Sequence, residues 1–185
     1  MAILKVGGTQ IASSSGSDVT LDNVALGSSV VFPAGHVLQV EQYTSQASHV
    51  TSSSHDAWQT TSILKAVTPK TTTSRFLVEL SAMGSSGGDT WLRTGMKATG
   101  SSISTTAFGT LDATPLSRSS PSAENVIVRV AWSIIVDVDQ SNIDDLITFT
   151  VWMNTGTGGT AGYLGSRSGA GATEGWTFLT VTEIA

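Results

Sequence analysis

The sequence predicts an all-β protein, an antiparallel β-sandwich of the jelly-roll type preceded by a short extended N-terminal arm. Ser and Thr supply 53 of the 185 residues and Gly another 19, while only 12% are charged. Such a composition favours strands and turns over helices. Short apolar runs with period-two alternation recur between Gly-, Ser- and Asn-rich intervals, and helical spacing is sustained nowhere. An immunoglobulin-like sandwich is the main alternative fold.

Residues 1–40 are predicted to form an N-terminal arm or attachment region. Its β-like pieces, at 3–6, 9–11 and 30–32, are divided by Gly7-Gly8 and by a Ser- and Gly-rich run at 13–17. Short isolated strands leave backbone groups unpaired, so we expect the arm to become ordered by packing on partner subunits. A flexible Ser/Gly linker is the alternative.

Residues 41–185 are predicted to form the sandwich, whose first strand begins slightly earlier. Alternation places Phe76, Val78 and Leu80 on one face of their strand, and Ile147 to Met153 show the same period. The run at 126–136 is apolar for longer than a half-exposed strand requires, which indicates a central strand or a subunit contact. Strands without intervening helices fit a jelly roll. The predicted strands are 37–43, 58–68, 76–83, 91–97, 103–108, 126–138, 145–153, 162–166 and 176–184.

Two segments carry a resemblance to a known group of proteins. Residues 20–40, TLDNVALGSSVVFPAGHVLQV, resemble a stretch that recurs in virion structural proteins of tailed bacteriophages, especially tail fibres and related surface proteins of marine phages. Residues 176–185, WTFLTVTEIA, are similar to the final strand of the same group, which typically ends LTVMEI. Thr182 stands where that group often has Met.

The resemblance implies a non-enzymatic virion protein on the particle surface, either a short fibre for host attachment or a capsid decoration protein. It implies assembly as a homotrimer, contact with other capsid or tail proteins through the arm, and a host surface glycan as a further partner. The chain would be made in the host cytoplasm and reside in the virion. Oligomerisation also has a physical argument, because long apolar strands without cysteines are protected from aggregation when their edges are buried between subunits.

Charge and composition exclude several other partners. The formal net charge is −5, and the nine basic residues are scattered, which argues against nucleic-acid binding. Cysteine is absent, so neither disulfides nor thiolate metal sites are expected, as suits a reducing cytoplasm. The start MAILKVGG does not read as a secretory signal, and no apolar run approaches the ~20 residues of a membrane span, so membrane insertion is not expected.

The motif search predicts no catalytic, cofactor or metal residues. His36, His49 and His55 form no zinc-binding spacing. His55 is followed by Asp56, but the serines around them have the composition of a loop, so no hydrolase triad is predicted there. Gly156-x-Gly158-x-x-Ala161 loosely matches a dinucleotide fingerprint, yet no helix pattern follows it, so a turn is the better interpretation.

The densest acidic segment runs from Asp137 to Asp145 and begins like a calcium loop. Asn142 replaces the required glycine and Thr148 the closing glutamate, so an EF-hand is excluded. A weaker calcium loop and a solvated turn both remain open for this segment.

The five tryptophans allow an alternative function. A soluble carbohydrate-binding module or a sandwich-fold glycoside hydrolase would use exposed rings or a carboxylate pair, and no such pair is evident. Trp91 is the candidate for exposure, but the sequence identifies no receptor-binding residues. The other four are predicted to be core or interface residues: Trp58, Trp132, Trp152 and Trp176.

Overall fold

The computed structural model of the chain divides into two compact units, Met1–Pro33 and Ala34–Ala185. Each unit is described by itself. The structure describes residues 2–6, 9–15, 18–21, 35–46, 49–50, 58–72, 74–86, 91–100, 103–108, 117–119, 127–137, 145–155, 161–165 and 175–185.

The first unit contains a three-stranded antiparallel sheet in the order β1-β2-β3, formed by β1 (Ala2–Val6), β2 (Thr9–Ser15) and β3 (Asp18–Leu21). The first two predicted arm pieces fall within β1 and β2. The third, at 30–32, lies outside the described residues. Pairing within this sheet satisfies backbone groups that isolated short strands would leave open.

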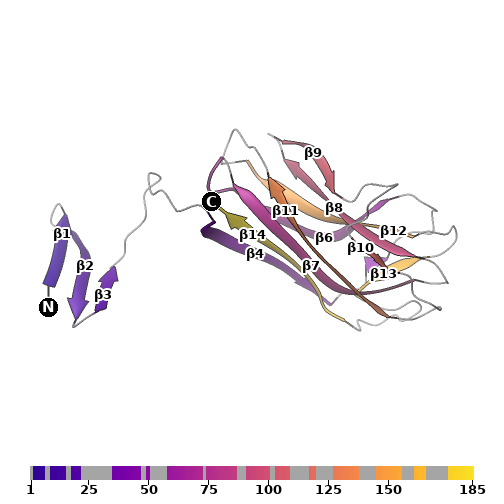
Figure 1. Cartoon of the computed structure of the whole chain (residues 1–185), viewed down its shortest axis with the longest axis horizontal. Coiled ribbons are helices and arrows are strands. Elements are labelled where there is room, and N and C mark those ends of the chain that lie inside the picture. Colours follow the sequence, from indigo (N-terminus) through magenta and orange to yellow (C-terminus); the bar gives the residue numbers. More distant parts are fainter. Residues whose placement is uncertain are drawn as a thin grey trace. The chain divides into compact units, whose positions relative to one another are not determined.

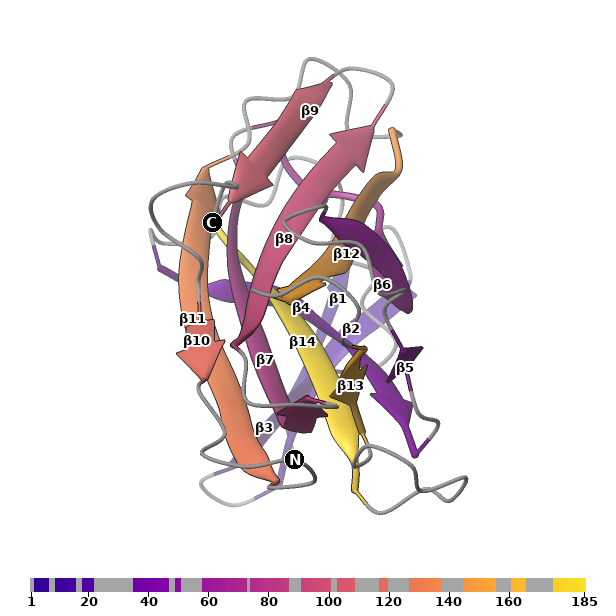
Figure 2. The same cartoon turned by 90° about the vertical axis from the view of Figure 1, so that its right-hand side faces the viewer.

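The second unit is a β-sandwich of two antiparallel sheets, shown as two layers in Figures 1 and 2. The first sheet has the order β4-β14-β7-β11, and β13 and β5 continue it beside the C-terminal end of β7. Its strands are β4 (Val37–Ser45), β5 (His49–Val50), β7 (Arg75–Ser86), β11 (Val128–Asp137), β13 (Gly162–Leu164) and β14 (Thr177–Ile184).

The second sheet has the order β6-β12-β8, and β9 and β10 both pair with β8. It consists of β6 (Gln59–Val67), β8 (Leu92–Gly100), β9 (Ile103–Phe108), β10 (Ser117–Ser119) and β12 (Ile147–Thr155). The described residues contain no helix, which confirms the predicted all-β sandwich. No helix among them is long and apolar enough to span a bilayer.

The core lies between the sheets and follows the predicted alternation. Phe76, Val78 and Leu80 of β7 are buried, as are the alternate β12 residues from Ile147 to Met153. The rings of Phe76 and Phe149 meet across the sandwich with centroids 5.3 Å apart. Close interdigitation of the two inner faces is what holds such sheets together.

One buried polar contact also joins the sheets. The Trp132 indole N–H of β11 donates to Thr94 Oγ1 of β8 at 3.0 Å, and both side chains are buried. A buried indole N–H needs an acceptor, so this hydrogen bond lets a large ring fill the core without an unpaired donor.

β11 lies at the edge of the first sheet rather than at its centre. It pairs with β7 along its whole length, while alternate residues such as Ala131, Ser133 and Ile135 face outward and are exposed. Of the two interpretations of the apolar run at 126–136, the central strand is therefore wrong. A subunit contact stays a prediction.

The second unit begins at Ala34, seven residues before residue 41, where the sandwich was predicted to begin. Just before β4, the Gly35 N–H donates to the Ala185 carbonyl at 2.9 Å, and the Ala185 N–H donates to the His36 carbonyl at 2.9 Å. Gly35 has φ of 85°, a left-handed conformation that glycine adopts without strain. The chain therefore turns into the domain at residue 35.

Candidate functional site

The outward side of the β4-β14-β7-β11 sheet, called the outer face below, is the most distinctive surface of the described domain. Strand register aligns its residues in rows that cross the four strands. One row reads Ile135, Leu77, Thr182 and Val40, and another reads Ser133, Glu79, Thr180 and Gln42. The outer face is thus a regular array of side chains. The first of these rows is mostly apolar, and the second is polar and charged.

Large apolar side chains are concentrated on the outer face and at the strand ends beside it. Eight such side chains are exposed among the described residues, and only Leu64 and Leu146 belong to the second sheet. The other six are Val37, Val40, Met83, Ile127, Ile135 and Trp176, which are 40 to 57% exposed. Of these six, Ile127 and Trp176 lie just before β11 and β14 and the other four lie in strands of the sheet, so this side of the domain carries most of the exposed large apolar side chains described.

A shallow depression of about 450 Å³ lies on this face between β11, β7 and β14. Small side chains on two strands, Ser81, Ala131 and Ser133, leave the space open, and Phe178 and Thr180 line its β14 side. The ring of Phe178 stacks on that of Trp176, with centroids 6.0 Å apart and planes 20° from parallel. The depression can therefore receive a protruding side chain or one small ring.

Two opposite charges line the depression, Arg129 on β11 and Glu79 on β7. Both are exposed, and neither forms an ion pair with another of the described residues. Arg129 pairs in register with Met83, four residues from Glu79 on the same strand, so the backbone positions of the two residues are about 13 Å apart along the strand. No ion pair joins the two side chains among the described residues.

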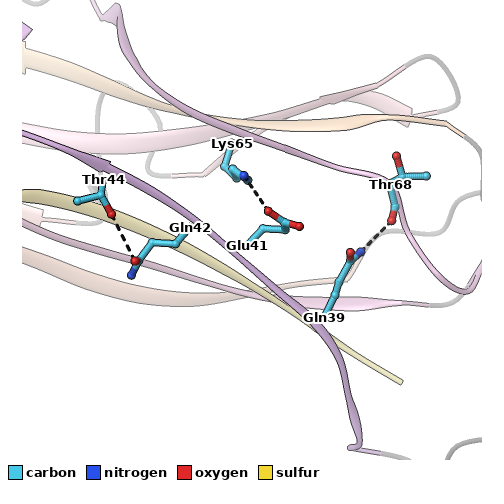
Figure 3. A network of polar contacts seen from close by, with 6 residues as sticks. All are labelled: Gln39, Glu41, Gln42, Thr44, Lys65 and Thr68. Carbon is cyan, nitrogen blue, oxygen red and sulfur yellow. Dashed lines mark hydrogen bonds and ion pairs between the residues drawn. The ribbon is translucent and has the colours of Figure 1, made fainter. Parts of the chain in front are cut away.

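The sandwich edge between β4 and β6 is closed by polar contacts instead. Lys65 Nζ lies 2.7 Å from Glu41 Oε2, and Gln39 Nε2 donates to the Thr68 carbonyl at 2.8 Å (Figure 3). Both contacts connect β4 with β6 or with the residue that follows it. These polar groups are engaged with one another, so this edge is a poorer docking candidate than the outer face.

Glu183 of β14 is a fully buried carboxylate near the start of β4. It accepts hydrogen bonds from Gln39 Nε2 at 2.5 Å, from the Lys70 backbone N–H at 2.6 Å and from the Ser74 hydroxyl. Ser74 is itself held by Thr71. Because a buried charge is tolerated only when it is hydrogen-bonded, Glu183 serves to join β14, β4 and the segment before β7.

Two of the three histidines, which show no zinc-binding spacing in the sequence, are described. His36 is exposed beside the Ala185 backbone, His49 lies in β5, and His55 lies outside the described residues. No group of three or more His, Cys, Asp or Glu side chains that suits a metal occurs in the described part of the chain.

The acidic segment lies mostly outside the described residues, as does most of the Gly156 to Ala161 motif. Asp137 is described, and its Oδ1 lies 2.5 Å from Arg75 Nε in an exposed ion pair across β11 and β7. This contact gives Asp137 a structural role at the end of the sheet.

The tryptophans differ from the expectation in two places. Trp132 is buried as predicted, and Trp58 and Trp152 are partly buried. Trp176, predicted to lie in the core or at an interface, is not in the core: it is 51% exposed. Trp91, the predicted exposed ring, is half-buried with the Arg93 guanidinium 4.5 Å from its centroid. The sequence pattern placed Trp176 in the last strand. In the structure it lies one residue before β14, outside the sheet.

Sequence reasoning did not single out Glu79, Arg129 or Glu183. Arg129 is a charge within an apolar run, and Glu183 interrupts the alternating pattern of its strand, whereas Glu79 occupies an outward position that alternation leaves polar. Arg129 and Glu183 therefore carried a signal in the sequence, but only strand register placed Glu79 and Arg129 at one depression. The chain matches no model of a known protein family and no curated protein.

Proposed function

We propose that this chain is a non-enzymatic structural protein of the surface of a tailed-bacteriophage particle, assembled as a homotrimer. It acts as a short fibre in host attachment or as a capsid decoration protein, and the N-terminal unit attaches it to other virion proteins. The support is the resemblance of residues 20–40 and 176–185 to virion proteins, together with their relation in the fold.

The two resembling segments form one piece of structure where they are described. β4, which holds the last residues of the first segment, pairs along its length with β14, which holds most of the second. The Gln39 to Glu183 hydrogen bond and the backbone bonds between Gly35, His36 and Ala185 join them further. The two segments that resemble virion proteins therefore lie together at the point where the chain enters its domain. This juxtaposition is the observation that carries the proposal.

The strand order supports a jelly roll as the specific form of the sandwich. In chain order β4 pairs with β14, β6 with β12, β7 with β11, and β8 with β9. β14 also pairs with β7, and β12 with β8. This nested pairing of first with last strands is what two interlocked Greek keys produce. Jelly rolls are frequent in viral capsid domains, which agrees with the proposed role.

Mass spectrometry and immunogold labelling of separated phage heads and tails test the location. We expect the chain in one of the two fractions, and its absence from both rejects a virion role. Loss of cell binding when the protein is removed from the particle indicates a fibre. Loss of capsid stability with cell binding intact indicates a decoration protein.

A soluble carbohydrate-binding module is the second candidate, and the outer-face depression favours it over a hydrolase. Glu79 is the one acid among its described lining residues, whereas glycoside hydrolysis ordinarily uses two carboxylates. Glycan-array binding by the chain that is lost on Trp176→Ala, without any association with virions, would establish this function.

A further inference from the structure

We propose that the outer face binds a second copy of this chain, with Arg129 of one copy opposite Glu79 of the next. The proposal rests on the proposed function for the homotrimer and adds the surface through which the copies meet. It commits to self-association, with glycan binding at the same surface as the competing outcome.

The outer face has the size that a stable contact between subunits needs. Four strands about 4.8 Å apart and about nine residues long cover roughly 600 Å² in projection. A standard interface buries about 800 Å² on each partner, which the relief of the side chains and the flanking Ile127 and Trp176 supply. The half-exposed apolar side chains on this face and at the strand ends beside it would be covered by such a contact.

The charges identify the partner as another copy of this chain. Arg129 and Glu79 line one depression, and they form no ion pair with each other there. When a second copy lies on the outer face and is shifted along the strands, its Glu79 comes opposite Arg129 of the first copy. Each unpaired charge then has an opposite charge beside it. An interface of this kind is self-complementary in charge, which fixes register and rejects unrelated partners.

The outer face also carries an apolar row. Ile135 lies on the β11 flank of the outer face and Val40 on the β4 flank, with Leu77 and Thr182 between them. A second copy seated on this face removes the exposed Ile135 and Val40 side chains from water, which favours association.

Sedimentation velocity of the full chain over a range of concentrations tests the contact, with variants Arg129→Glu, Glu79→Arg and the double exchange. We expect each single variant to weaken self-association about tenfold or more, because like charges then face each other. The double exchange should restore the wild-type oligomer. Both residues are exposed, so the circular dichroism spectrum of the folded chain should not change.

Ile135→Asp should dissociate the oligomer, whereas Leu64→Asp serves as a matched control, since Leu64 is equally exposed but on the second sheet. A monomeric wild type at all concentrations, or single variants that associate normally, overturns the proposal. So does a double exchange that fails to restore association, or a monomer whose Trp176 and Phe178 resonances shift with a soluble glycan.

The virion assay separates this proposal from the proposed function. If the wild-type and variant chains have the same oligomeric state and both are recovered on particles, the virion role stands. The outer face is then rejected as the contact. A charge-dependent oligomer that is absent from particles supports the contact and rejects the virion role.

Discussion

Glu183 shows how one residue organises the end of the sandwich where the chain enters. Its two carboxylate oxygens hold a side chain of β4 and the segment before β7, while its own strand is the one next to β4. A hydrophobic residue would fit the alternation of β14 but would leave these donors without an acceptor. Glutamate at this position therefore determines the local connections between strands.

Replacing Glu183 by Leu should destabilise the fold by about 3 kcal/mol or more, because several donors lose their acceptor and each such loss costs about 1–3 kcal/mol. Glu183→Gln keeps one acceptor oxygen for Lys70 and Ser74 and should cost less. Urea unfolding of both variants checks the order. Equal stability of Glu183→Leu and the wild type would contradict the assigned role.

Gly84 of β7 is restricted by packing. A Cβ at this position would lie 2.6 Å from Leu92 Cδ2 and 2.7 Å from Val130 Cγ2, and both neighbours are fully buried. Gly84→Ala should therefore cost about 1–3 kcal/mol by overpacking, measured as a lower denaturation midpoint.

Gly175 provides the matched control for Gly84. Its added Cβ would meet the flexible and 42% exposed side chain of Met83, which can rotate away. Gly175→Ala should have the smaller effect in the same measurement. A reversed order would show that contact with the core does not limit Gly84.

At the level of elements, the two sheets are held together by interdigitated side chains and by the Trp132 to Thr94 hydrogen bond. This bond joins β11, an edge strand, to β8, which lies within the second sheet. An edge strand has one neighbouring strand instead of two, so a side-chain bond across the core contributes more to its placement.

Thr94→Val should cost about 1–3 kcal/mol, because the methyl group replaces the acceptor and leaves the buried indole N–H unpaired. In a Trp132→Phe background the same change should cost much less, since the donor is already absent. A double-mutant cycle of unfolding free energies checks the difference. Additive costs would show that the bond contributes nothing to stability.

The sequence predicted the strands whose burial pattern can be recognised over a few consecutive residues. Period-two alternation located β7, β12 and β14 because burial of one face leaves a direct pattern, as at Phe76 and Phe149. The short β5 and β10 were missed, since two or three residues show no period. The position of β11 at an edge was not predictable from the sequence. An apolar strand has the same hydrophobic pattern whether neighbouring β-strands or another subunit cover it.

The outer face was not predicted for a related reason. It is assembled from alternate residues of four strands that are up to about a hundred and forty positions apart in the sequence, such as Val40 and Thr182. Strand register alone brings Glu79 and Arg129 to the same depression. Spacing along the chain carries no information about such rows.

On the scale of the whole molecule, the two units have separate structures. The sandwich of Ala34–Ala185 has its own core between two sheets, and the described members of that core all belong to this unit. A chain that lacks residues 1–33 should therefore unfold cooperatively at a midpoint close to that of the full chain. Calorimetry of both chains measures this, and a large loss of stability on truncation would show that the first unit supports the sandwich.

The hydrogen bonds between Gly35, His36 and Ala185 bring positions that are 150 residues apart in sequence into direct contact. Such proximity is the condition for circular permutation. A short peptide that connects residue 185 to residue 34 would let the polypeptide be opened elsewhere without loss of any strand. It follows that a cargo fused after Ala185 would emerge beside the point where the chain from the first unit enters, leaving the opposite end of the sandwich unobstructed.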